Sequence, residues 1–140
     1  MKVLVIGSGG REHALVWKIS QSPAVKKIYC TPGNAGIARQ AECLPFTAEE
    51  GPSILSWAEK EKIDLTVVGP EAPLVMGLVD AFQERGLRIF GASQRAAEIE
   101  GSKAFAKHIM KKYGIPSGDS RVFADYGAAV RYVQETGAPV

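Results

Sequence analysis

Three glycines in four residues follow the first apolar run of the chain. The run, residues 3–6, leads into the glycine loop, residues 7–10, and a helical pattern begins at once in the segment GSGGREHAL. Free backbone N–H groups and the positive end of a helix dipole would then point to one place, which is a ready site for an anion. The simpler alternative is a tight strand-to-helix turn with a structural role alone.

The glycine loop departs from the dinucleotide-binding fingerprint G-x-G-x-x-G. Gly7 and Gly9 match its first two glycines, but Glu12 stands at the third, the position that allows close packing of helix on strand. The second apolar run, residues 28–30, is followed by Thr-Pro-Gly-Asn and not by an acid that could bind a ribose hydroxyl. The lysine of a Walker A loop is missing as well. The pattern therefore disfavours a nicotinamide or flavin cofactor and leaves a phosphate group as the candidate ligand.

Two further polar residues follow later apolar runs. Asn34 closes TPGN, which is also an ordinary turn sequence, and Glu71 opens the segment EAPL. A carboxylate in the first turn of a helix is favoured by the dipole whatever its role, but at a strand end it could also accept two sugar hydroxyls. Arg11 and Glu12 fit a solvated first turn as well as a binding site, and we expect His13 to be structural.

The composition is that of an ordinary globular protein. Of 140 residues, 46% are hydrophobic and 23% are charged, and the net charge of +2 is too small for a typical nucleic-acid-binding domain. The apolar runs are too short for a signal peptide or a membrane span, so we expect a cytoplasmic protein whose partners are neither nucleic acid nor membrane. Cys30 and Cys43 have no metal-site spacing and are expected to be small hydrophobic residues.

Strand and helix patterns alternate through the first 90 residues. Short apolar runs that end at Gly or Pro turns predict strands at residues 3–6, 28–30, 65–68 and 88–90. Helical periodicity predicts helices at residues 11–20, 52–62 and 73–85, the last closed by a glycine at 86. This alternation predicts an α/β, Rossmann-like, open and mostly parallel sheet with helices on both faces, whose ligands bind at the carboxyl ends of the strands.

The pattern changes after residue 91. We predict helices at residues 93–100, 102–113 and 125–136, a strand at 121–123, and a turn into a further strand at 137–140, where the chain looks cut. Lys107 and Lys111 are expected to lie on a solvated face of their helix. Lys103 opposes the helix dipole in the first turn, which makes it the better candidate for a role with an anion.

Four motifs, GSGGREHAL, TPGNAG, VVGPEAPL and GSKAFAKHIMKKYGIP, share their order and spacing with one family. Together they resemble the phosphoribosylamine–glycine ligases, also called glycinamide ribonucleotide synthetases, which are ATP-grasp enzymes. The resemblance covers essentially the whole chain. It implies a Rossmann-like substrate-binding domain over residues 1–100 and the truncated start of an ATP-grasp domain over residues 101–140.

The resemblance implies a ligase of de novo purine biosynthesis. Members of the family join 5-phosphoribosylamine and glycine, with hydrolysis of ATP to ADP and phosphate, to give glycinamide ribonucleotide. ATP with Mg²⁺ or Mn²⁺ phosphorylates the glycine carboxylate, and the amine then attacks the glycyl phosphate. Fixed cations and amides in a water-poor cleft would stabilise the charge that develops. The resemblance also implies that the full-length enzyme is a monomer.

The resemblance assigns roles to residues of this chain. Those expected on the phosphoribosylamine side of the cleft are Gly7, Ser8, Gly9, Gly10, Arg11, Glu12, Asn34 and Glu71. Glu71 would bind the ribose hydroxyls, and Lys103 would reach the nucleotide phosphates. Family members are much longer, and their catalytic residues and metal ligands are expected outside these residues, so we expect this chain alone to be inactive.

Two other functions stay open at this stage. One is a dinucleotide-binding domain of an oxidoreductase, against which the acid at position 12 argues. The other is a short, non-catalytic binding or assembly module.

Overall fold

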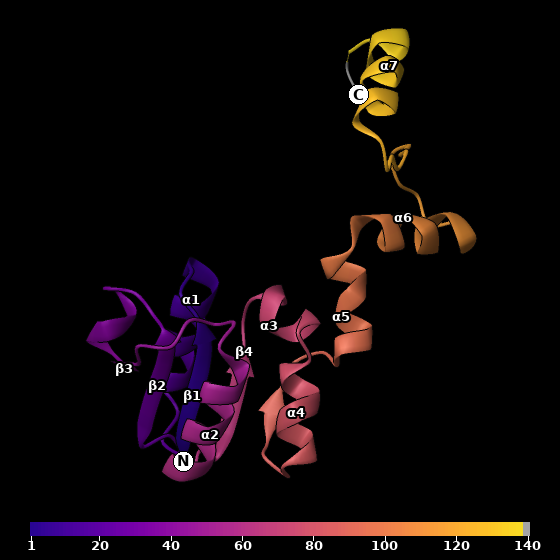
Figure 1. Ribbon diagram of the computed structural model, residues 1–140. Helices are drawn as coiled ribbons and strands as arrows, with labels where there is room; N and C mark the ends of the chain where they lie inside the picture. Colours follow the sequence, from indigo (N-terminus) through magenta and orange to yellow (C-terminus); the bar gives the residue numbers. More distant parts are fainter. Residues whose placement is uncertain (139–140) are drawn as a thin grey trace. The chain divides into compact units, whose positions relative to one another are not determined.

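The computed structural model describes residues 1–138 and divides the chain into two compact units, Met1–Gly101 and Ser102–Val140 (Figure 1). Residues 139–140, which belong to the predicted turn into a further strand at 137–140, lie outside the described residues. The assignment of the two units to a substrate-binding domain and an ATP-grasp domain stays a prediction.

The first unit is built on a five-stranded parallel sheet. Its strands are β1 (Lys2–Gly7), β2 (Lys27–Pro32), β3 (Glu42–Cys43), β4 (Leu65–Val68) and β5 (Ile89–Phe90). Its helices are α1 (Gly10–Ser20), α2 (Gly51–Glu61), α3 (Glu71–Val75), α4 (Leu78–Glu84) and α5 (Gln94–Gly101), with a 3₁₀ turn, η1 (Ile37–Arg39). The strand order is β3-β2-β1-β4-β5, and every neighbouring pair is parallel. The predicted open parallel sheet is confirmed.

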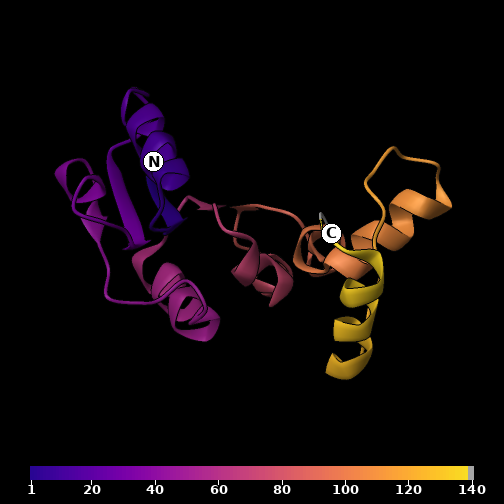
Figure 2. The ribbon, with the colours of Figure 1, turned by 90° about the horizontal axis from the view of Figure 1, so that it is seen from above.

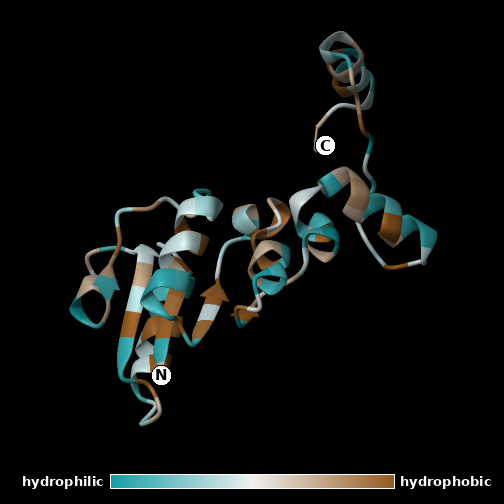
Figure 3. Ribbon diagram, turned by 60° about the horizontal axis from the view of Figure 1, so that its bottom comes forward, coloured by the Kyte–Doolittle hydropathy of each residue, from teal (hydrophilic) through white to brown (hydrophobic). Residues whose placement is uncertain are grey.

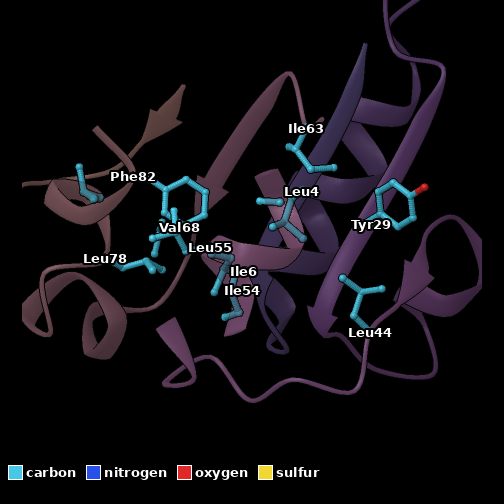
Figure 4. Close-up of a cluster of buried hydrophobic side chains, with 12 residues drawn as sticks. Leu4, Ile6, Tyr29, Leu44, Ile54, Leu55, Ile63, Val68, Leu78 and Phe82 are labelled. Carbon is cyan, nitrogen blue, oxygen red and sulfur yellow. The ribbon is translucent and has the colours of Figure 1, made fainter. Parts of the chain in front are cut away.

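Helices cover both faces of the sheet. Leu4 of β1 points into a core that includes Phe82 of α4 and the apolar face of α2 (Figure 4). Val3 and Val5 point the other way, against Val16 of α1. Figure 2 shows α1 and α2 on opposite sides of the strands, and hydrophobic segments lie within the strands in Figure 3. Because both faces are buried, the strands read as continuous apolar runs.

The helix predicted at residues 73–85 is wrong, because two helices occupy this stretch. The first, α3, ends at Val75, and α4 begins after Gly77, whose φ of +83° is a left-handed conformation that ends a helix. Apolar residues keep the same helical spacing across the break, so the sequence pattern did not indicate that the helix is interrupted. Gly86, with a φ of +69°, follows α4 as predicted.

Two strand predictions also need correction. β3 was not predicted, because it is an edge strand of two exposed residues without an apolar run. The strand predicted at residues 121–123 is absent from the described residues: Val122 is 72% exposed, and the Phe123 ring packs on Tyr132 of the next helix with ring centroids 5.4 Å apart. A strand needs a partner for its backbone, and this segment pairs with none within residues 102–138.

The second unit contains α6 (Lys103–Lys112) and α7 (Tyr126–Thr136). Ser102 and Asp125 cap these helices: their side-chain oxygens accept hydrogen bonds from the third helical residue of each. Lys107 does not lie on a fully solvated face, because its Nζ donates to Ser117 Oγ and to the Gly118 carbonyl at 2.5 and 2.8 Å. No residue between 102 and 138 is fully buried. Within residues 1–138, no helix is both long and apolar enough to cross a membrane.

The two cysteines differ in their surroundings. Cys30 is buried as expected, and burial raises the pKa of its thiol to about 12. Cys43 is exposed on the edge strand β3, which does not fit its expected role as a small hydrophobic residue.

We expect Ellman's reagent to modify one thiol of the folded chain rapidly and the second only after unfolding, because attack needs an exposed thiolate. Cys43→Ser should abolish the rapid phase and leave the slow one. Equal rates for both thiols would contradict the described burial of Cys30.

Two buried threonines give a matched test of core packing. The Thr66 hydroxyl is buried without a hydrogen-bond partner in the described part of the chain, whereas Thr31 Oγ1 donates to the Phe46 carbonyl at 2.6 Å. Thr66→Val should therefore raise the free energy of unfolding by about 1 kcal/mol, and Thr31→Val should lower it by about 1 kcal/mol. Urea denaturation measures both, and opposite signs are the decisive result.

Candidate functional site

The carboxyl ends of three strands meet at one edge of the sheet. The strand β1 lies between β2 and β4, at the point where the strand order reverses, and open parallel sheets bind ligands at such a point. The loops are tied together there: Gly33 N–H donates to the Gly7 carbonyl at 3.1 Å, and Gly69 N–H donates to the Ile6 carbonyl at 3.0 Å. The predicted loop residues of the first unit therefore share one site.

Glu12 is buried beneath the glycine loop. Its side chain is 4% exposed, and both carboxylate oxygens are engaged. Oε2 accepts from Gly9 N–H at 2.7 Å, and Oε1 accepts from Arg11 Nε at 2.9 Å. A buried carboxylate is tolerated only with such partners, so Glu12 holds the first turn of α1 to the loop.

Two glycines make room for this carboxylate. A Cβ on Gly7 would lie 2.5 Å from Glu12 Cγ, and a Cβ on Gly69 would overlap the carboxylate itself. In the dinucleotide fingerprint the third glycine is on the helix; here the helix carries the acid, and the space comes from Gly69 at the end of β4.

Arg11 and Glu71 lie opposite each other at the solvent-exposed opening of the site. Arg11 Nη2 lies 3.8 Å from Glu71 Oε2, and the two side chains are 61% and 55% exposed. The hydrogen bond to Glu12 raises the pKa of Arg11, and the charges of Glu71 and Glu100 act in the same direction. One guanidinium is thus surrounded by carboxylates, two of which solvent can reach.

Asn34 ties the loop after β2 to the glycine loop. Its Nδ2 donates to the Ser8 carbonyl at 2.7 Å, while its Oδ1 accepts from Gly36 and Ile37 N–H at 2.8 and 2.9 Å. The His13 ring packs against the same turn, since a Cβ on Gly36 would lie 2.6 Å from its Cε1. The packing agrees with the structural role expected for His13.

A cavity of about 440 Å³ opens beside the site. Arg11, Gly69 and Glu71 line one side, and Leu74 and Ile99 contribute apolar surface on the other. A second hollow, of about 520 Å³, lies at the amino ends of the strands, where β2 and β3 begin, and contains none of the predicted residues. Of these two cavities, the first is the one lined by predicted site residues.

The structure brings together the predicted residues of the first unit and leaves Lys103 in the first turn of α6, in the second unit. Sequence reasoning missed Gly69 and Glu100. A glycine at the end of an apolar run was a signal for Gly69, whereas no pattern marked Glu100. No cluster of three or more His, Cys, Asp or Glu residues that could hold a metal ion is found in residues 1–138, so we assign no metal ligand here.

Comparison with known proteins gives the family. Residues 1–100 match the model of the phosphoribosylglycinamide synthetase N domain. The chain belongs to this family. The phosphoribosylamine–glycine ligase of Caldanaerobacter subterraneus subsp. tengcongensis is 56% identical over all 140 residues, which cover 34% of that protein. The chain thus spans about a third of the length of this relative.

Solved structures agree with the family assignment. The crystal structure of phosphoribosylamine–glycine ligase from Thermotoga maritima is 31% identical, with a TM-score of 0.67, over 99% of this chain and 31% of that one. N5-carboxyaminoimidazole ribonucleotide synthetase from the same organism has a TM-score of 0.69 at 20% identity, over 99% of this chain and 37% of its own, and shows the shared fold alone. The synthetase N-domain fold is thus the fold of a wider group of proteins.

Gly69→Ala tests the space that the end of β4 leaves for the Glu12 side chain. The new methyl group would displace the carboxylate, and such overpacking should lower the free energy of unfolding by about 2 kcal/mol in urea denaturation. Gly10→Ala is the control, because a Cβ there meets nothing within 4 Å. Equal stability of the two variants would contradict the described position of Glu12.

Proposed function

We propose that this chain supplies the phosphoribosylamine side of the active site of a phosphoribosylamine–glycine ligase, an ATP-dependent enzyme of cytoplasmic purine synthesis. The observation that supports this most is the 56% identity, over all 140 residues, to a relative of that name. Residues 1–100 would be its substrate-binding domain, and residues 101–140 the start of its ATP-grasp domain. Its substrates would be 5-phosphoribosylamine, glycine and ATP.

The phosphate of the sugar would bind at the start of α1. The first intrahelical bond runs from His13 N–H to the Gly9 carbonyl at 3.1 Å, so the N–H groups of Gly10, Arg11 and Glu12 have no partner within the helix. These N–H groups and the helix dipole favour an anion. The exposed guanidinium of Arg11 would add a second, charged donor.

The sugar hydroxyls would bind Glu71. Its carboxylate is 55% exposed and lies next to Arg11, so it can accept two hydroxyl hydrogen bonds while the phosphate occupies the helix end. A negatively charged mouth formed by Glu71 and Glu100 also suits the amine of phosphoribosylamine better than a second phosphate.

The nucleotide would contact the second unit. Lys103 is exposed in the first turn of α6, where a lysine can meet phosphate oxygens. ATP with Mg²⁺ supplies the activation of the glycine carboxylate when bound. The described residues offer no clustered metal ligands, so the part proposed for this chain is to hold and orient the sugar phosphate.

Titration with ribose 5-phosphate, a stable analogue of the amine, tests the proposal. We expect amide shifts in the ¹H–¹⁵N spectrum at Ser8, Gly10 and Arg11, and no such shifts with NAD. Glu71→Gln should raise the Kd at least about tenfold, the equivalent of about 1.4 kcal/mol, because a carboxamide accepts hydroxyl hydrogen bonds with one oxygen only.

Two controls make this titration specific. Glu84→Gln removes an exposed carboxylate at the end of α4, the end that leads into β5 and so lies at the opposite edge of the sheet, and should leave the Kd unchanged. With 2-deoxyribose 5-phosphate the effect of Glu71→Gln should shrink, because one hydroxyl is gone. Shifts confined to other surfaces, or a tighter complex with NAD, would contradict the proposal.

A further inference from the structure

The predicted site residues differ in how many polar atoms they leave free. Glu12 has none to offer, since its side chain is 4% exposed and its oxygens already accept from Gly9 N–H and Arg11 Nε. Arg11 keeps both terminal nitrogens for other partners. Glu71 is 55% exposed and contacts Arg11 only at 3.8 Å. A ligand can therefore reach Arg11 and Glu71 directly but not Glu12.

Asn34 is also occupied. Its Oδ1 accepts two backbone N–H groups of its own turn, and its Nδ2 donates to the Ser8 carbonyl at 2.7 Å. This last bond crosses from the loop after β2 to the glycine loop. Glu12 holds the glycine loop from beneath, and Asn34 holds it from the loop after β2.

We infer that Glu12 and Asn34 are positioning residues, which fix the glycine loop and Arg11, and that a ligand contacts the loop N–H groups, Arg11 and Glu71. The identity of the ligand, a phosphorylated sugar, rests on the proposed function. The assignment of positioning and ligand-contact roles rests on the hydrogen bonds and exposures described above.

The pairing with Glu12 also fixes how Arg11 can act. If the guanidinium turned fully toward a ligand, a buried carboxylate would lose its cationic partner, which is unfavourable. Arg11 therefore keeps Nε–H on Glu12 and presents the N–H groups of its two terminal nitrogens to the site. The planar guanidinium is then oriented before any ligand binds.

Two conservative variants test the inference. Glu12→Gln has one oxygen for two donors, so it should release Arg11; Asn34→Asp keeps the acceptor for its own turn but removes the donor to Ser8. In the ligand-free 140-residue chain, the order parameter of Arg11 Nε–H should fall in the first variant. In Asn34→Asp, the order parameters of the Ser8 and Gly9 amides should fall. Each variant should raise the Kd for ribose 5-phosphate at least about fivefold.

A matched control separates positioning from general destabilisation. Glu50 accepts from the N–H group three residues before it, Thr47, as Glu12 does from Gly9, but in a loop outside the site. Glu50→Gln should lower the melting temperature without changing the Arg11 signal or the Kd for ribose 5-phosphate.

A double-mutant cycle supplies the decisive outcome. If Glu12 acts partly through Arg11, then Glu12→Gln should change the Kd less once Arg11→Ala is present, because only the contact with Gly9 is then left to lose. Additive effects of the two changes would show that Glu12 acts independently of Arg11 and would overturn the inference. Unchanged order parameters in both variants would overturn it as well. If ribose 5-phosphate does not bind the unmodified chain, the proposed function fails, and the order parameters still decide the positioning role.

Discussion

The buried carboxylate of Glu12 is the constraint on which the rest of the site depends. An ion out of water costs several kcal/mol unless it is paired and hydrogen-bonded. Here the N–H of Gly9 and the guanidinium of Arg11 supply those partners, and Gly7 and Gly69 supply the space. The conformation of the loop, the absence of a side chain at the end of β4 and the orientation of Arg11 are therefore consequences of one side chain.

The parallel sheet provides what a single side chain cannot, a common edge for loops far apart in sequence. Because β1 lies between β2 and β4, the turn that holds Asn34 and the start of α3, which holds Glu71, flank the glycine loop from opposite sides. Asn34 reaches the loop by a hydrogen bond to Ser8, and Glu71 approaches it through Arg11. The site thus joins three connections, and each is anchored by a strand with buried side chains.

The sequence predicted those elements that bury continuous apolar runs, and it failed where pairing or backbone conformation decided. The strands β1, β2 and β4 were found because both of their faces are covered. The edge strand β3 has no such run, and the break at Gly77 depends on a positive φ that periodicity does not report.

In the site, Gly7, Arg11 and Glu71 stood out by type and position. The direction of the Glu12 side chain could not be predicted, because it depends on the register that sets Gly69 beside β1.

The acid at position 12 also changes what the loop can offer to an anion. In the dinucleotide fingerprint, the second glycine lets the backbone approach a pyrophosphate. Here Gly9 N–H already donates to Glu12, so an anion is left with the first-turn N–H groups of α1 and the guanidinium of Arg11. A guanidinium at the end of a side chain binds one phosphate group, often through two parallel N–H···O hydrogen bonds. Under the proposed function, the exchange of one glycine for Glu12 therefore suits the loop to a single sugar phosphate, because it removes a backbone donor and orients a charged one.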